Sequence, residues 1–68
     1  MRKLKLYNCI KYYRHRDYLT QSDLASSLHV SKNTVSSWEN YDYYPTAYHV
    51  ALLCKLFNCD FFDLFYFD

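Results

Sequence analysis

Residues 20–40, TQSDLASSLHVSKNTVSSWEN, contain two short helical patterns separated by three residues. The second pattern is apolar on one side. Its other side carries small amides and hydroxyls beside a lysine, namely Lys32, Asn33, Ser36, Ser37 and Asn40. An exposed helix face normally carries Lys and Glu, which favour helix and solvate well. These short donors and acceptors therefore indicate a hydrogen-bonding face that was selected for something other than solubility.

The remaining reactive side chains do not form a catalytic or metal-binding pattern. The three histidines lie on different segments without a recognisable nucleophile motif, and a glycine-rich phosphate loop is impossible in a chain with no Gly. Cys9, Cys54 and Cys59 are odd in number and lack CxxC spacing, which argues against a disulfide framework and favours a reducing compartment. A zinc site could be imagined from His49, Cys54 and Cys59. It is not expected, because His49 and Cys54 are five residues apart and do not share a helix face. We expect no enzyme activity, no metal and no cofactor.

Composition predicts one small folded domain spanning residues 1–68. Hydrophobic residues make up 51% of the 68 residues and aromatic residues 22%, so a few large side chains must supply much of the core. Residues 1–34 hold seven Lys and Arg against two Asp, a net +5, whereas residues 35–68 have a net −4 from one Lys against five acidic residues. The basic half, with a short basic arm at 1–5, points weakly to a polyanionic partner. No apolar run resembles a signal peptide or membrane span, so we expect a cytoplasmic protein.

Hydrophobic periodicity predicts five helices and an all-α fold. Leu6, Ile10 and Tyr13 recur at helical spacing over residues 5–16. Thr20 with Asp23 forms a capping-box pattern that opens the second helix. The third, fourth and fifth helices are expected to begin after three further polar caps and to bury one apolar face each; the caps are Ser31, Thr46 and Asp60. No alternating strand pattern exceeds four residues, and the fifth helix is expected to run through Phe65.

With its predicted helices in this order, the chain resembles the helix-turn-helix domain of the phage lambda-repressor and Cro family, over roughly residues 6–66. The motif itself would span about residues 21–40. The family's arginine, leucine-threonine-glutamine and leucine-alanine steps match Arg14, Leu19-Thr20-Gln21 and Leu24-Ala25. Its turn and second motif helix match Val30-Ser31 through Trp38-Glu39-Asn40, and its later elements match Pro45, Leu53 to Phe57 and Asp60 to Phe65. The resemblance implies a compact five-helix DNA-binding domain.

The resemblance also implies roles for individual residues. The second motif helix of such domains lies in the DNA major groove, where Asn pairs with adenine, Lys with guanine and Ser with either kind of base edge. Lys32, Asn33 and Ser37 match base-contacting positions. Gln21 and Asn40 match positions that hold phosphates, and Ser31 is both an N-cap and a candidate phosphate donor.

Two further residues match a partly buried salt bridge of the family, Arg14 on the first helix and Glu39 at the end of the motif's second helix. Trp38 is expected in the core because it is in phase with Val35.

The family's glycines are replaced in three places, by Tyr18, His29 and Tyr41. A left-handed backbone at a non-Gly residue costs about 1 kcal/mol. Histidine tolerates this conformation better than tyrosine does. We therefore expect the turn at His29 to be kept, the loops at Tyr18 and Tyr41 to be reshaped, and the path of residues 41–44 to be open.

The aromatic tail at 61–68 predicts a homodimer. Phe61, Leu64 and Phe65 suit the core, which leaves Phe62, Tyr66 and Phe67 as more apolar surface than one small domain hides. The alternative is a monomer whose tail folds back over the first helix.

The functional hypothesis is a small transcriptional regulator that binds double-stranded DNA sequence-specifically. The type expected is a repressor of a phage or mobile element that acts on a palindromic operator by occupancy alone, without a small-molecule substrate or a membrane. One alternative is a protein-interaction module on the same fold, with surface aromatics serving a partner. Another is an antitoxin, which adds a protein partner to the same DNA chemistry.

Overall fold

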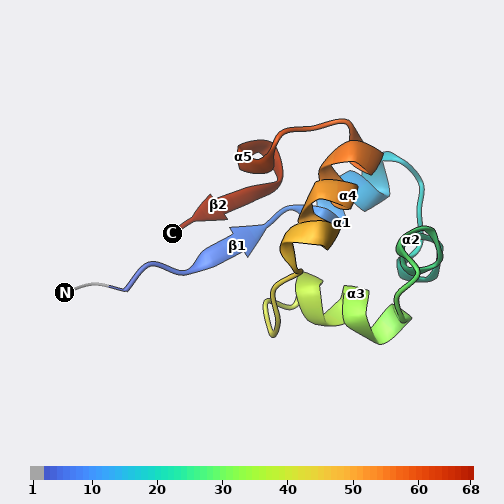
Figure 1. Ribbon diagram of the computed structural model, residues 1–68, viewed down its shortest axis with the longest axis horizontal. Coiled ribbons are helices and arrows are strands. Elements are labelled where there is room, and N and C mark those ends of the chain that lie inside the picture. Colours follow the sequence, from blue (N-terminus) through green and yellow to red (C-terminus); the bar gives the residue numbers. More distant parts are fainter. Residues whose placement is uncertain (1–2) are drawn as a thin grey trace.

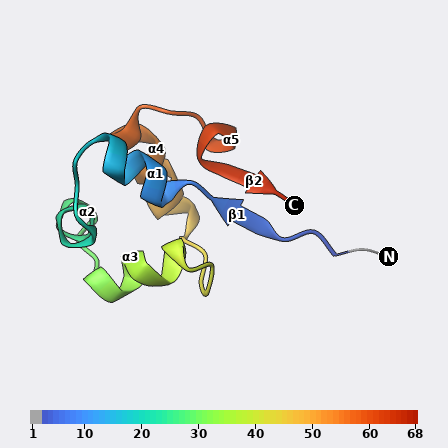
Figure 2. The same ribbon diagram turned by 180° about the vertical axis from the view of Figure 1, so that it is seen from behind.

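The computed structural model describes residues 3–68, and within them it has five helices and two short strands. In chain order the elements are β1 (Leu6–Asn8), α1 (Ile10–Arg16), α2 (Gln21–Leu28), α3 (Lys32–Glu39), α4 (Ala47–Phe57), α5 (Phe61–Leu64) and β2 (Phe65–Phe67). The helices α1 and α4 lie centrally, with α2 and α3 on one side and the two strands on the other (Figures 1 and 2). The fold is mostly helical, as predicted.

The strands correct the all-α expectation. β1 pairs antiparallel with β2, with Leu6 opposite Phe67 and Asn8 opposite Phe65. The first helix therefore begins at Ile10 rather than near residue 5, and the last helix ends at Leu64. The physical reason is that residues 6–8 gain backbone partners from the end of the chain, and the N–H of Cys9 donates to the carbonyl of Leu64 at 2.8 Å. The tail consequently pairs with the segment before α1 instead of lying over α1.

The core forms where the helices and the start of β2 meet. Its fully buried or nearly buried members are Ile10, Leu24, Ala25, Leu28, Val35, Trp38, Leu53, Phe57, Leu64 and Phe65. The predicted place of Trp38 in the core, in phase with Val35, is thus confirmed. The assignment of Phe61 to the core is wrong: its side chain is 37% exposed, because its ring stacks on the outside of Phe65 at 5.0 Å between centroids.

The predicted N-cap hydrogen bonds of Thr20, Ser31 and Thr46 are present. Thr20 Oγ1 accepts the N–H of Asp23 at 3.0 Å, and the Asp23 carboxylate accepts the N–H of Thr20 at 2.9 Å. The backbone hydrogen bond from Thr20 lowers the pKa of Asp23. Ser31 caps α3 and Thr46 caps α4 in the same way, which satisfies N–H groups that the helices cannot pair internally.

The C-termini of α1 to α4 all close with the same two hydrogen bonds, and none uses a glycine. At each of these ends, a residue within two positions of the end of the helix has positive φ: Tyr18 at 58°, His29 at 57°, Tyr41 at 64° and Asn58 at 54°. At the end of α1, for instance, the N–H of Tyr18 donates to the backbone carbonyl of His15, and the N–H of Leu19 donates to that of Arg14. This is the Schellman arrangement, which glycine usually completes because it pays no Cβ penalty there.

The expectation that tyrosine would reshape two of these turns is wrong. Tyr18 keeps the left-handed conformation with its side chain 94% exposed. Tyr41 keeps it with its ring packed edge-on against Tyr7 at 5.0 Å, and Tyr7 in turn stacks on Tyr66 at 5.6 Å. The turn at each helix end gives hydrogen-bond partners to carbonyl groups of the last helical turn. This gain outweighs a local backbone cost of about 1 kcal/mol.

These turns predict where glycine stabilises the protein. Tyr18→Gly and His29→Gly should each raise the free energy of unfolding by about 0.5–1 kcal/mol, because they relieve a left-handed Cβ and the added unfolded-state entropy cancels only part of the gain. Tyr41→Gly should give no net gain, because it also removes the contact with Tyr7. Urea denaturation midpoints measure the differences.

Tyr48→Gly is the matched control, since Tyr48 is also exposed but lies within α4. That change should destabilise by about 0.5–1 kcal/mol. Destabilisation by Tyr18→Gly of the same size as by Tyr48→Gly would contradict the account of these turns.

Candidate nucleic-acid interface

The helix α3 is held by its apolar side against the rest of the domain. Val35 is fully buried and Trp38 is 3% exposed, while the small side chain of Ala25 on α2 is buried at 3% exposure. A small residue at this position lets α2 and α3 approach closely. Because the apolar side is covered, the opposite side of α3 is presented outward.

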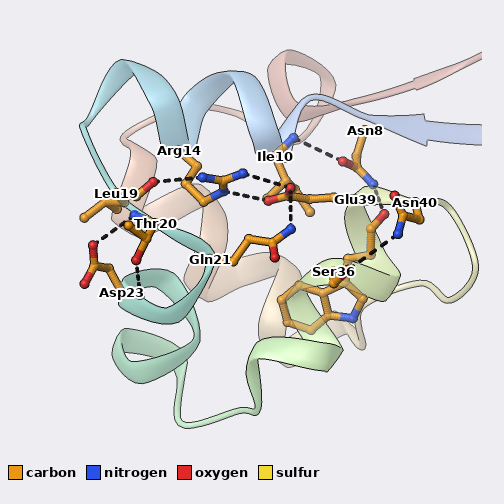
Figure 3. A network of polar contacts seen from close by, with 11 residues as sticks. Asn8, Ile10, Arg14, Leu19, Thr20, Gln21, Asp23, Ser36, Glu39 and Asn40 are labelled. Carbon is orange, nitrogen blue, oxygen red and sulfur yellow. Dashed lines mark hydrogen bonds and ion pairs between the residues drawn. The ribbon is translucent and has the colours of Figure 1, made fainter.

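A buried ion pair links α1 to the end of α3 (Figure 3). Arg14 Nε donates to Glu39 Oε2 at 2.8 Å and Nη2 donates to Oε1 at 3.1 Å, with the two side chains 8% and 4% exposed. The third guanidinium nitrogen, Nη1, donates to the carbonyl of Leu19 at 2.9 Å. The predicted salt bridge is therefore present, and its bidentate geometry fixes the relative orientation of the helices.

The charge state of this pair is set by competition between burial and pairing. Burial alone would raise the pKa of Glu39, but hydrogen bonds from Arg14 and Gln21, together with the charge of Arg14, lower it below the usual value. The hydrogen bond to Glu39 likewise raises the pKa of Arg14. A carboxyl whose pKa is lower in the folded state contributes stability above its unfolded pKa of about 4.3 and loses that contribution as the pH falls through the folded value.

Asn8 is a second anchor of α3 that the sequence analysis missed. Its Nδ2 donates to the carbonyl of Trp38 at 2.9 Å, and its Oδ1 accepts the N–H of Ile10 at 3.1 Å (Figure 3). One amide thus caps the start of α1 and satisfies a carbonyl at the end of α3. The available signal was an Asn two residues before a helix start, a common Asx turn.

The outward side of α3 carries the predicted base-contacting residues. Lys32 and Asn33 are exposed, and Ser37 is half-buried one turn further along. Asn33 and Ser37 line one shallow hollow. Lys32 lies apart from it, in a hollow of about 660 Å³ that it shares with Gln21 at the start of α2. The structure therefore places four of the candidates in the lining of two hollows, with Gln21 and Lys32 in one and Asn33 and Ser37 in the other, while Ser31 is the N-cap of α3.

The three predicted phosphate-contacting residues already make contacts within the protein. Gln21 Nε2 donates to Glu39 Oε1 at 3.1 Å, which uses one of its two amide hydrogens. Ser31 Oγ accepts the N–H of Thr34 at 3.1 Å. Asn40 Nδ2 lies 3.4 Å from Ser36 Oγ at the exposed end of α3 (Figure 3). Ser31 thus serves as the expected cap, and Gln21 as a neighbour of the ion pair.

The basic residues around this surface are few. Lys3 and Lys5 of the predicted arm are exposed and line a hollow with Leu4 and Tyr44; Arg2 lies outside the described residues. Arg16 is held by Asp17 at 3.0 Å and by the carbonyl of Phe57 at 2.8 Å. The residues that the tail contributes to the predicted dimer surface are exposed, at 76% for Phe62, 45% for Tyr66 and 55% for Phe67.

Two other kinds of feature are absent from residues 3–68. Within that range no helix has the length and apolar character needed to cross a bilayer. The same part of the chain holds no group of three or more His, Cys, Asp and Glu side chains placed to bind a metal ion.

Comparison with known proteins agrees with this geometry. The chain belongs to the XRE-type helix-turn-helix family, whose model matches residues 10–64. It is 36% identical over 61 residues to an uncharacterized HTH-type transcriptional regulator of Methanocaldococcus jannaschii, covering 90% of this chain and 92% of that one. It also resembles the crystal structure of a candidate DNA-binding protein from Bacteroides fragilis, with a TM-score of 0.80 and 26% identity over 90% of this chain and 98% of that one. The family supports DNA binding and transcriptional regulation as the class of function.

The buried pair predicts a large cost for losing either partner. Arg14→Ala or Glu39→Ala should lower the free energy of unfolding by roughly 3–5 kcal/mol, because each leaves a buried charge without its partner. A chain of this size has a total stability of about 3–10 kcal/mol, so either variant should lose a large share of it, and its urea denaturation midpoint should fall well below that of the parent.

Two further variants separate burial from general sensitivity. Arg14→Met combined with Glu39→Leu leaves neither charge buried and should recover part of the loss. Asp17→Ala, which breaks the exposed pair with Arg16, should change stability little. Equal, small effects of Arg14→Ala and Asp17→Ala on the denaturation midpoint would show that the buried pair contributes no more than the surface pair.

Proposed function

We propose that this chain is a small transcriptional regulator that binds double-stranded DNA sequence-specifically by placing α3 in the major groove. The observation that carries the proposal is the two-sided construction of α3. Its apolar side is buried and tied to α1 by the Arg14–Glu39 pair, and its opposite side presents Asn33 and Ser37 with Lys32 at the start. Helix-turn-helix proteins contact base edges with the N-terminal residues of the corresponding helix.

Each outward side chain has a matching partner on a base edge. The Asn33 amide can pair with N6 and N7 of adenine, Lys32 with O6 and N7 of guanine, and the Ser37 hydroxyl with either kind of edge. Ser31 and Asn40 stand at opposite ends of α3, roughly 14 Å apart along the axis at 1.5 Å per residue. We propose that they and Gln21 contact the phosphates on the two sides of the groove.

Electrostatics favours binding of modest affinity. The basic half of the chain contains the whole of α1, α2 and the start of α3, whereas Asp42 lies in the loop after α3. Binding that depends on few Lys and Arg contacts releases few counterions, and each contact contributes about one unit to the slope of log affinity against log salt. The same chemistry, binding without catalysis, suits a repressor that acts by occupying its operator.

Base contacts can be tested by single substitutions on α3. Asn33→Ala should weaken binding to the best site by about 1–3 kcal/mol and relax preference at one base pair per half-site. Lys32→Ala should also weaken binding; if Lys32 contacts phosphate, the loss is similar on all sequences and the salt slope falls by about one. The measurement is a titration of matched and scrambled duplexes at two salt concentrations.

Lys55→Ala is the matched control, since Lys55 is exposed on α4 and has the same charge as Lys32. It should leave affinity and salt slope nearly unchanged. Equal binding of the parent to matched and scrambled duplexes, with no effect of Asn33→Ala, would reject α3 as a recognition helix. The protein-interaction module would then be the better account.

We propose further that the protein is a homodimer joined through its C-terminal tail. Phe62 and Phe67 expose most of their surface, and they adjoin a two-stranded sheet that has open edges. Exposed aromatic clusters and unpaired strand edges are both typical of interfaces. A two-fold dimer would require half-sites about 10 base pairs apart in a palindromic operator.

The dimer is tested by sedimentation at micromolar concentration. The parent should sediment as a dimer, and the double variant Phe62→Ser/Phe67→Ser as a monomer. Tyr48→Ser removes a similarly exposed aromatic from α4 and should leave the dimer intact. A parent that remains monomeric with and without DNA would rule out this interface.

The remaining details of the proposal concern biological setting. We place the protein in the cytoplasm, as one functional unit over residues 1–68, and in the class of regulators carried by phages and mobile elements. An antitoxin would share the DNA contacts of α3 and use the exposed tail aromatics for a toxin instead of a second copy. A pure dimer in the sedimentation experiment favours the repressor.

A further inference from the structure

A hollow of about 240 Å³ lies beside α3, and one residue outside the helix-turn-helix motif, Tyr43, completes its lining. Its lining comes from α3, at Asn33, Thr34, Ser37 and Trp38, and from Tyr43 in the loop that follows. The loop turns back onto the helix because the N–H groups of Asp42 and Tyr43 both donate to the carbonyl of Ser37, at 3.0 and 3.4 Å. Tyr43 is thereby placed beside the base-contacting residues.

The lining of the hollow combines polar and aromatic side chains. Asn33 and Ser37 supply amide and hydroxyl groups. Trp38, 3% exposed, and Tyr43, 70% exposed, add aromatic side chains to the lining. Thr34 adds a methyl group. Such a site accommodates a small apolar group that lies next to hydrogen-bonding groups.

In the major groove, the C5-methyl of thymine is the apolar group that an A·T pair presents, and the thymine O4 separates it from the N6 and N7 atoms of the adenine. Asn33 is suited to those adenine atoms, and the hollow begins at Asn33. We propose that the hollow takes the C5-methyl group of a thymine and that Tyr43 is a specificity-determining residue of the DNA site. The proposal rests on the function proposed above, because it requires α3 to lie in the major groove.

The loop supports this assignment because the backbone at Tyr43 is hydrogen-bonded to Ser37 on α3. Tyr41 keeps positive φ at 64° while its ring packs on Tyr7, so the start of the loop is fixed to the sheet. A loop that is already ordered loses less conformational entropy when a base contacts it. Tyr44, the next residue, lines a different hollow with Lys3, Leu4 and Lys5.

Replacing thymine by deoxyuridine removes only the methyl group, and it tests the proposal directly. The probe is the duplex that the parent protein binds best, with each thymine replaced in turn. One position per half-site should show binding about fourfold weaker, the effect of withdrawing one buried carbon group. Tyr43→Ala should bind the thymine and deoxyuridine duplexes equally at that position and retain the sequence preference that Asn33 provides.

Two variants isolate the role of the Tyr43 ring. Tyr43→Phe keeps the ring without the hydroxyl and should preserve the discrimination between thymine and deoxyuridine. Tyr44→Ala, the matched control from the same loop, should preserve it too. Loss of discrimination in Tyr43→Phe would overturn the proposal, because the hydroxyl and not the ring would then be responsible.

The outcomes separate this proposal from the function on which it rests. Sequence-specific binding in which every deoxyuridine duplex binds as tightly as its thymine counterpart overturns the methyl site and leaves the regulator intact. Equal binding to all duplexes, whatever their sequence, overturns both. Circular dichroism of each variant confirms that the parent fold is kept before affinities are compared.

Discussion

Arg14 and Glu39 bring two charges into a 68-residue protein at 8% and 4% side-chain exposure, and three helices depend on how those charges are satisfied. Glu39 ends α3, where the helix dipole disfavours a carboxylate. The guanidinium offsets that cost with two hydrogen bonds, and its third nitrogen donates to the carbonyl of Leu19 just before α2. Gln21, the first residue of α2, completes the set by donating to the same carboxylate. These contacts fix the orientation of α3 relative to α1 and α2.

The absence of glycine from the chain is a second constraint, and it connects the fold to the site. Four helices end with a non-Gly residue in the left-handed region, so the protein stores strain at turns that glycine would relax. At Tyr41 the same residue that carries strain also packs on Tyr7, which anchors the loop after α3 to the sheet. A relaxed glycine there would leave the loop, and with it Tyr43, less firmly placed beside Asn33.

The sequence was sufficient for features that depend on neighbouring residues. The caps at Thr20, Ser31 and Thr46 and the buried stripe through Leu24 and Val35 follow from local hydrogen bonding and periodicity, and the structure has them. The Arg14–Glu39 pair came from family resemblance, because nothing local links residues 25 apart. For the site, the outward position of Lys32 and Asn33 could be predicted from helix phase, whereas their DNA contacts remain a proposal.

The features that were missed depend on distant segments. Leu6 fits a helical spacing with Ile10, but pairing with Phe67 at the other end of the chain makes it a strand residue. Phe61 is as apolar as a core residue. It nevertheless lies at the surface, because Phe65 takes the buried position and the Phe61 ring stacks on it. Asn8 contacts the end of α3 across 30 residues of sequence, so no local pattern shows that contact.

The measurement that tests the central claim most directly is selection of bound sequences from a random pool of double-stranded DNA by the full chain. An α3 that is held rigidly and presents Asn33 outward predicts enrichment of a palindrome whose half-sites are about 10 base pairs apart and contain an invariant A·T pair. A pool that stays random after repeated rounds, at salt low enough to retain nonspecific binding, would contradict the claim that this surface recognises DNA sequence.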